Sequence, residues 1–242
     1  MTLELGISDK VKQLRREGLR PAERLVRAIT NAGAAALGPL LALAIDTDLL
    51  HEEPPEAFAP LHALRLLGEL NSVEIIEPLL RTFPVLLDYE DEELPQSWVE
   101  EVPQIIGHLG APAIEPLGRI ADDERWNMHG RSGALTALTY ATAADPALRD
   151  AVLAGLRERL DRSVDKTFSS HLAIALANLG VRDLYADLMA MYRAGRIDQD
   201  ILPAAAARQL LLTDSTKRLA CATHPLWERY DQHGPFPAER EV

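Results

Sequence analysis

The chain has 242 residues and a formal net charge of −12, from 25 basic and 37 acidic side chains. This length fits one large domain or two small ones, with a large buried fraction. Binding to DNA or RNA rests on lysine and arginine contacts with phosphate, so the acidic balance argues against nucleic acid as a partner. The single cysteine, Cys221, excludes an internal disulfide framework.

The hydropathy of the chain predicts where the protein resides. Residues 1–6 lack a basic region followed by an apolar core, so we expect no signal peptide. No stretch approaches the roughly 18 to 20 uncharged apolar residues that a membrane span needs. We therefore expect a cytoplasmic protein with no membrane partner.

Apolar residues recur at helical spacing along most of the chain, and no segment alternates as a strand does. The spacing predicts two leading helices, at 8–17 and 21–32. It then predicts five helix pairs, at 34–45 with 55–70, 72–86 with 95–109, 112–121 with 129–143, 146–160 with 166–179, and 182–194 with 199–212. A short helix at 214–222 follows, and the prolines and glycine beyond Thr223 predict an extended tail.

Sequence marks repeat along the predicted pairs. A Pro-Leu dipeptide recurs at intervals of 39 and 38 residues, at Pro39-Leu40, Pro78-Leu79 and Pro116-Leu117. Helix ends are marked by capping residues, with Ser72 and Asp145 as N-caps and with left-handed glycines at Gly18, Gly68, Gly110, Gly180 and Gly195. A helix pair of this size cannot bury its own apolar face, so stacked neighbours must complete the core.

These patterns predict an all-α fold, an α-solenoid of about five antiparallel helix pairs with N-terminal capping helices. We expect one helical-repeat domain over residues 1–222 and an extended tail over 223–242. Within the domain, residues 1–32 form N-terminal capping helices, 33–212 form the repeats, and 214–222 form a C-terminal capping helix.

Residues 112–144 contain the segments Ala113-Ile114-Glu115-Pro116-Leu117, Asp122-Asp123 and Arg131-Ser132-Gly133-Ala134-Leu135. In this pattern the chain resembles the HEAT-repeat family over residues 33–212, and the long turns of the first two pairs resemble those of a bacterial branch of helical-repeat proteins. The resemblance implies that Asp122 or Asp123 pairs with Arg131 and ties neighbouring repeats together. The other repeats lack this arginine, since the corresponding positions lie near Pro55, Ser97 and Thr167.

Charge is distributed unevenly along the chain. Residues 1–30 hold seven basic and four acidic side chains, whereas residues 39–124 hold three basic and nineteen acidic ones. Many acids fall in the turns within helix pairs, and such turns stack along one edge of a solenoid. This predicted acidic edge includes Asp46, Asp48, Glu52, Glu53, Asp88, Glu90, Asp91, Glu92, Glu93, Asp122, Asp123 and Glu124.

Two interpretations of the acidic edge remain open. It could dock a protein partner with a basic surface, steered by the electric field. Alternatively, the acids could stabilise helix N-termini and keep the protein in solution. The run at 88–93 exceeds what helix capping needs, so we hypothesise that it contacts a basic partner.

The second helix of each pair is expected to line a concave groove. Polar residues fall at helical spacing on these helices, at His62, Arg65, Glu101, Gln104 and His108. These residues could bind a peptide or a small polar ligand. Alternatively, they could form the solvent-exposed polar face of ordinary amphipathic helices. Trp98 and Trp126 stand at the starts of second helices, where each could be an interface hot spot or a packing plug between repeats.

No motif in the sequence predicts a catalytic residue, a metal site or a cofactor. Gly-x-Ser-x-Gly, a phosphate-binding loop and His-Glu-x-x-His are absent, and the acidic run at 88–93 lacks the pattern of an EF-hand. The favoured function is a HEAT-like scaffold that binds a basic or amphipathic protein partner through the acidic edge or the groove. The alternative is a small-molecule enzyme similar to HEAT-like chromophore lyases, with His62, His108 or Glu101 in the groove.

Overall fold

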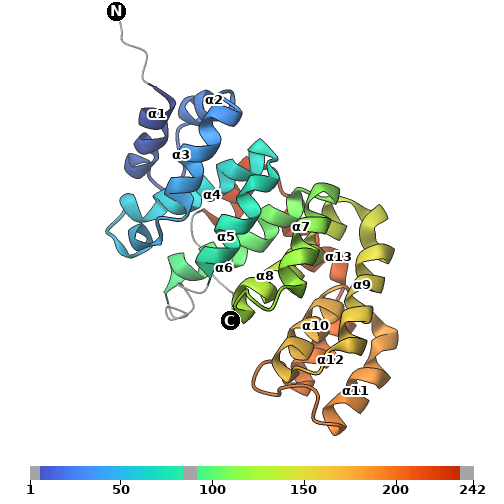
Figure 1. Ribbon diagram of the computed structural model, residues 1–242. Helices are drawn as coiled ribbons and strands as arrows, with labels where there is room; N and C mark the ends of the chain where they lie inside the picture. Colours follow the sequence, from blue (N-terminus) through green and yellow to red (C-terminus); the bar gives the residue numbers. More distant parts are fainter. Residues whose placement is uncertain (1–5, 84–91, 235–242) are drawn as a thin grey trace, which may run out of the picture. The chain divides into compact units, whose positions relative to one another are not determined.

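A computed structural model describes residues 6–83 and 92–234, and the chain over these residues is helical and contains no strand. The first helices are α1 (Ile7–Gln13), α2 (Glu23–Thr30), α3 (Ala34–Ala44), α4 (Ala59–Leu70), α5 (Ile76–Thr82) and α6 (Glu93–His108). The later helices are α7 (Ala111–Asp122), α8 (Met128–Ala144), α9 (Arg149–Arg162), α10 (Lys166–Asn178), α11 (Tyr185–Arg193), α12 (Ala204–Leu212), α13 (Ser215–Leu219) and α14 (Leu226–His233) (Figure 1). The predicted all-α class is confirmed.

The helices belong to two compact units. Unit 1 comprises Met1–Leu109 together with His224–Val242, and unit 2 comprises Gly110–Thr223. In unit 1, α3 packs against α4, α5 against α6, and α4 against α6. In unit 2, α7 packs against α8, α9 against α10, and α11 against α12, while α10 contacts both α8 and α12. Each predicted helix pair is therefore a pair of contacting helices.

Capping residues define several helix boundaries. The predicted caps are confirmed at Asp145, whose Oδ1 accepts from the backbone of Ala147 at 3.0 Å, and at Ser72, whose Oγ accepts from that of Glu74 at 3.3 Å. Positive φ angles occur at Gly110 (64°), Gly180 (69°) and Gly195 (69°), where the sequence predicted left-handed glycines.

Two glycines were assigned wrongly. Gly18 and Gly68 lie outside the left-handed region, and the chain turns after α4 at Asn71, with φ of 50°. Gly68 lies inside α4, where an added Cβ would stand 3.2 Å from Cδ1 of Ile105. Because Gly68 has no side chain, α4 can pack closely on α6 at this position. Gly68 does not terminate the helix.

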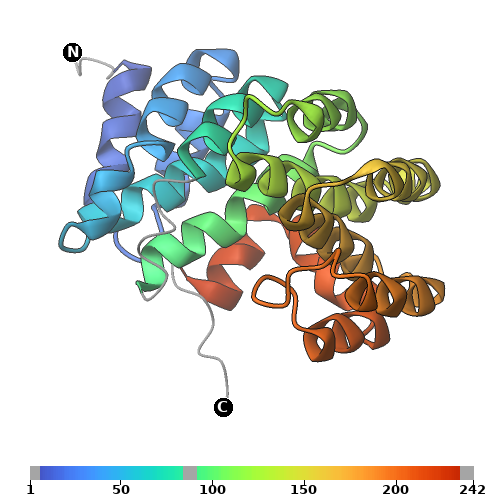
Figure 2. The same cartoon turned by 60° about the horizontal axis from the view of Figure 1, so that its bottom comes forward.

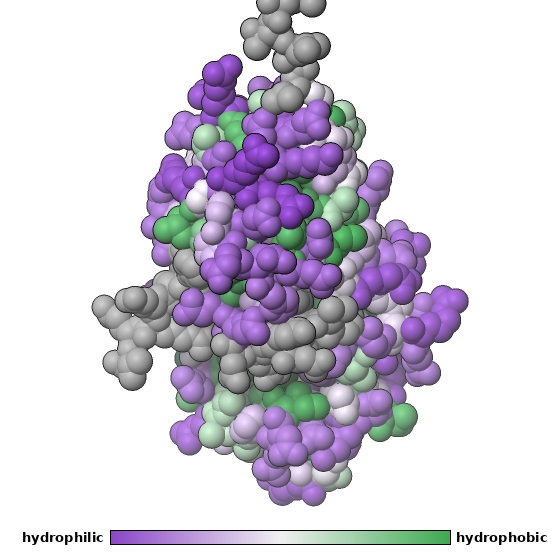
Figure 3. Space-filling view, turned by 90° about the vertical axis from the view of Figure 1, so that its left-hand side faces the viewer, coloured by the Kyte–Doolittle hydropathy of each residue, from purple (hydrophilic) through white to green (hydrophobic). Residues whose placement is uncertain are grey.

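The cores of both units are built from leucine and alanine. Fully buried examples are Leu40, Leu61 and Leu64 in unit 1, and Leu117 and Leu172 in unit 2. The face drawn in Figure 3 is mostly hydrophilic, with hydrophobic residues in small separate areas. The apolar stripes therefore lie inside the units, as the helical periodicity predicted.

The C-terminal part of the chain folds back onto earlier helices. In unit 2, α13 packs against α8 and α10, and the 3-10 turn η8 (Ala220–Thr223) packs against α8. In unit 1, α14 packs against α4, and Figure 2 shows it in red beside α6. The expectation of an extended tail is thus corrected over Leu226–His233, because Leu226, Arg229 and Tyr230 bury one face of a helix.

Candidate functional site

Four of the residues predicted to line the groove meet α14 in unit 1. His62 and Arg65 come from α4, Glu101 and Gln104 from α6, and Arg229 and Tyr230 from α14; together we call these six residues the α14 cluster. His62, Arg65 and Tyr230 are only 0%, 2% and 5% exposed. The expectation that His62 and Arg65 line an open groove is therefore corrected, because the chain's own C-terminal helix covers them.

A bidentate ion pair joins α4 to α6 in this cluster. Nε of Arg65 donates to Oε2 of Glu101 at 2.8 Å, and Nη2 donates to Oε1 at 2.5 Å. The ring of Tyr230 covers the guanidinium, with Cζ of Arg65 4.6 Å from the ring centroid. Burial opposes the charge of Arg65, yet Glu101 more than offsets it and raises the pKa of the guanidinium.

Both ring nitrogens of His62 have hydrogen-bond partners. Nε2 lies 2.9 Å from the carbonyl oxygen of Gly18, which can only accept, so Nε2 carries the proton. Nδ1 then accepts from the Tyr230 hydroxyl at 2.8 Å. Burial, reinforced by the charge of Arg65, lowers the pKa of His62 to about 4. The imidazole is therefore neutral at pH 7 and joins α4 to α14.

The depressed pKa of His62 predicts acid-sensitive stability. The unfolded histidine titrates near 6.5 and the folded one at about 4, so the unfolded state binds more protons between these values. We expect the contribution of His62 to stability to be constant well above pH 6.5 and to fall by about 3 kcal/mol as the pH drops to 4. Urea titrations across this range would measure the slope, which His62→Gln should reduce; an equal slope in the variant would contradict the assignment.

Further polar contacts fix α14 on unit 1. Nη1 of Arg229 donates to Oε1 of Gln104 at 3.2 Å. Arg20 pairs with Asp231, and its Cζ lies 4.7 Å from the ring centroid of Trp227. These α14 residues were not predicted from the sequence, because the prolines and glycine beyond Thr223 indicated an extended tail.

The remaining predicted residues have varied environments. Trp98 is fully buried, and its Nε1 donates to the carbonyl oxygen of Ala44 at 2.8 Å. It is therefore a packing residue and offers no surface to a partner. His108 is half-buried in α6. Trp126 is half-buried and lines a pocket of unit 2.

The predicted acidic edge is only partly described. Asp88, Glu90 and Asp91 lie outside the described residues, whereas Glu92 and Glu93 are exposed. Oε2 of Glu92 lies 2.8 Å from Nδ1 of His51. Other exposed acids in the turns of unit 1 are Asp46, Asp48, Glu52 and Glu53.

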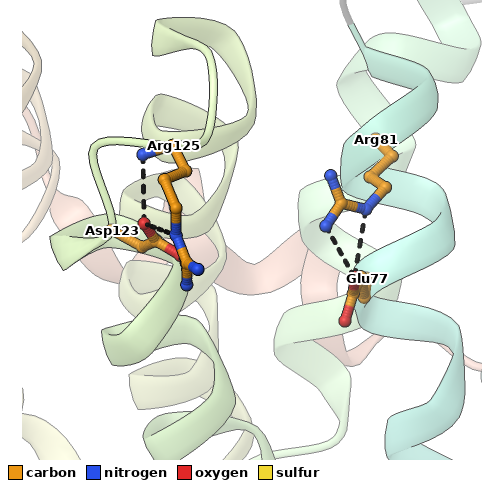
Figure 4. Close-up of polar contacts among 4 residues, drawn as sticks. All are labelled: Glu77, Arg81, Asp123 and Arg125. Carbon is orange, nitrogen blue, oxygen red and sulfur yellow. Dashed lines mark hydrogen bonds and ion pairs between the residues drawn. The ribbon is translucent and has the colours of Figure 1, made fainter.

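Among the described residues, Arg131 forms no hydrogen bond or close ion pair with Asp122 or Asp123, although its charge helps to lower the pKa of Asp123. Asp122 instead pairs with Arg159 of α9, through two contacts of 2.7 Å. Asp123 bonds to Arg125 two residues further on (Figure 4), and these hydrogen bonds lower the pKa of Asp123 to about 2. Neighbouring pairs in unit 2 are thus joined by an aspartate–arginine pair, but the arginine is Arg159.

The described residues were also searched for metal-binding clusters and for membrane-spanning helices. Among them, no group of three or more His, Cys, Asp or Glu side chains could hold a metal ion. No single described helix is long and apolar enough to cross a membrane. Among the helices that the structure describes, the pair α2 and α3 reaches that length and hydropathy when taken together, and the two helices are bent by 119°.

The sequence was compared with models of protein families and with curated proteins. No protein-family model matches it, and no curated protein matches it. The resemblance of residues 112–144 to HEAT repeats therefore stays a prediction. Function has to be inferred from the contacts of the described residues themselves.

Proposed function

We propose that the protein is a protein-interaction scaffold of the HEAT-like solenoid type that holds an amphipathic helix of a partner against α4 and α6. One observation carries this proposal: this face of unit 1 already holds a helix, α14. Binding of an amphipathic helix to a helical surface is a recurrent mode of peptide recognition. In this proposal, α14 is the resident occupant that a partner helix replaces.

Contacts between successive helix pairs support the solenoid part of the proposal. Within unit 1 the second helices α4 and α6 touch, and within unit 2 the second helices α8, α10 and α12 touch in series. Stacked repeats bury their cores through such nearest-neighbour contacts. The same second helices receive the returning C-terminal segment, as expected if they form the binding face.

The contacts of α14 indicate what a partner helix must offer. It needs an apolar residue, an arginine and a tyrosine at the spacing of Leu226, Arg229 and Tyr230, which places all three on one helix face. The tyrosine would stack on Arg65 and bind His62, as Tyr230 does at 4.6 Å and 2.8 Å. Because α14 is covalently attached, it competes with a partner helix for the face of α4 and α6 at a high effective concentration. A partner must therefore bind this face tightly, or bind it when α14 is partly detached.

Peptide exchange tests this function. We expect a labelled peptide spanning residues 223–234 to bind full-length Tyr230→Ala at least about tenfold more tightly than the wild type, because α14 of the variant competes weakly. Fluorescence anisotropy measures binding, and the peptide should also raise the melting temperature of the variant. The matched control is the same peptide with its tyrosine replaced by alanine.

Two results would contradict the proposal. In the first, the peptide fails to bind a folded Tyr230→Ala protein, so that the face is not an exchangeable site. In the second, the peptide binds, but no cellular protein retained by the variant is released when the peptide is added. The face would then serve only the chain's own helix.

The other candidate functions have weaker support. The basic partner at the acidic edge stays a prediction, supported by the exposure of Glu92 and Glu93. The alternative of a lyase-like enzyme is not favoured by this geometry. His62 is buried with both ring nitrogens bonded, and Glu101 is held by Arg65.

A further inference from the structure

Unit 2 contains a pocket beside the turn between α7 and α8 and the turn between α9 and α10. Its volume is about 510 Å³, within the roughly 300–1,000 Å³ typical of ligand pockets. Its polar lining includes Arg131, Arg159, Arg162, Asp122, Glu124 and Asp165. Its apolar lining includes Trp126, Met128, Val164 and Phe168.

Arg131 is the buried cation of this pocket. The residue is 9% exposed, and its guanidinium lies over the ring of Phe168, with Cζ 3.9 Å from the centroid. Its Nε donates to the carbonyl oxygen of Ala121 at 2.9 Å. Its Nη atoms form no hydrogen bond or ion pair with any residue that the structure describes. The charge of Asp123 acts on Arg131, but the carboxylate of Asp123 accepts its hydrogen bonds from Arg125. The Nη hydrogens of Arg131 can therefore be donated to an anion that enters the pocket.

Two acids of the lining, Asp122 and Asp165, already have partners. Arg159 holds Asp122 through two contacts of 2.7 Å. Oδ1 of Asp165 accepts from the backbone nitrogen of Phe168 at 2.8 Å and so caps α10. The three arginines of the lining are matched by three acids. The acids of the lining would repel a doubly charged phosphate more strongly than a ligand with one negative charge.

The apolar residues of the lining can contact a planar group of a ligand. Trp126 and Met128 are both half-buried and both belong to the lining. Val164 is fully exposed at the edge of the pocket, at 101% of its reference area. A bound molecule could cover this side chain and gain from the removal of its apolar surface from water.

We propose that this pocket binds a ligand in which one carboxylate group is attached to an aromatic ring. The carboxylate accepts hydrogen bonds from the Nη atoms of Arg131, and the ring lies against Trp126. Planar guanidinium and carboxylate groups match in the two-bond geometry that favours arginine at such sites. The ligand is either a free aromatic acid or the C-terminal residue of a peptide, which share this chemistry. The site is independent of the helix-binding face of unit 1.

The test uses full-length protein and small probes of defined charge. Titration calorimetry and saturation-transfer NMR should show that phenylacetate binds at least about tenfold more tightly than its neutral isostere phenylacetamide. Phenyl phosphate should bind more weakly than phenylacetate. N-acetyl-Gly-Phe with a free or an amidated C-terminus distinguishes the two sources, because a peptide site binds the free-terminus form more tightly than it binds phenylacetate.

Matched variants locate the site. Arg131→Gln should weaken phenylacetate binding at least about tenfold, and Trp126→Ala should weaken it severalfold. Arg157→Gln is the control, because Arg157 pairs with Asp183 in the same unit and does not line the pocket. Circular dichroism would verify that each variant is folded. If Arg131→Gln does not fold, the proposed site is tested by Trp126→Ala and by the comparison of phenylacetate with phenylacetamide.

Three outcomes would overturn the proposal. The first is equal binding of phenylacetate and phenylacetamide, or no binding of any probe at millimolar concentration. The second is unchanged phenylacetate affinity in folded Arg131→Gln or in Trp126→Ala. The third is tighter binding of phenyl phosphate, which would contradict the assignment of a single charge.

Discussion

Replacing Glu101 with alanine should destabilise the protein by about 3–5 kcal/mol. The substitution leaves the charge of Arg65, whose side chain is 1% exposed, without its counter-ion. Removal of one partner from a buried ion pair is costly because the remaining charge stays out of water. Urea unfolding followed by tryptophan fluorescence would measure the loss, since Trp98 and Trp227 both belong to unit 1.

Two control variants separate this effect from the general cost of losing an ion pair. Glu77 and Arg81 form an exposed pair on α5 (Figure 4), and Glu77→Ala should cost no more than about 0.5 kcal/mol. The double variant Arg65→Met, Glu101→Leu removes both charges and should recover most of the lost stability. A cost for Glu101→Ala no larger than that for Glu77→Ala would contradict the structural role of the pair.

Replacing Tyr230 with alanine should cost about 3–5 kcal/mol, as do other substitutions of alanine for a large buried aromatic residue. The phenol ring covers Arg65, and its hydroxyl donates to His62 at 2.8 Å. The variant loses the apolar contact area and the stacking, and α14 should detach more readily from α4. Hydrogen exchange of the α14 amides would show the detachment, alongside the shift in urea midpoint.

Tyr230→Phe separates the hydroxyl from the ring. It keeps the ring over Arg65 but leaves Nδ1 of His62 without its donor, so we expect a loss of about 1–2 kcal/mol. The exposed neighbour Gln232 donates to Glu228 on the same helix at 2.7 Å, and Gln232→Ala should change stability by less than about 0.5 kcal/mol. If Tyr230→Ala behaved like Gln232→Ala, α14 would not hold unit 1 together.

Much of the local structure follows from the sequence. The spacing of leucines and alanines predicted the helix pairs, because a buried stripe needs an apolar residue every three or four positions. Asp145 and Ser72 were recognised as caps since their side chains can satisfy free amides at a helix start. These features depend on residues close in the chain, which a single sequence displays directly.

The candidate site was harder to predict because its partners are distant in sequence. His62 and Arg65 were identified as polar residues on a second helix, but periodicity does not reveal what covers them. Tyr230, which covers both, belongs to a short helix between Pro225 and Gly234. The four-residue spacing of Leu226 and Tyr230 was the available signal, and the surrounding prolines and glycine obscured it.

The hydrogen-bond partners of Asp122 and Asp123 were difficult to predict for a similar reason. The resemblance to HEAT repeats identified the acids and the arginine but not the competition among nearby cations. Arg125 captures Asp123 from two residues away, and Arg159 reaches Asp122 from α9. Arg131 is left to stack on Phe168.

The position of α14 has a consequence for synthesis on the ribosome. Tyr230 follows His62 by 168 residues, so at roughly 5–20 residues per second it emerges about 8 to 34 s later. Throughout that interval the nascent chain presents an unshielded histidine and arginine to chaperones and proteases. A message that ends before α14 would leave this patch permanently uncovered, so translation through α14 is what completes the packing of unit 1.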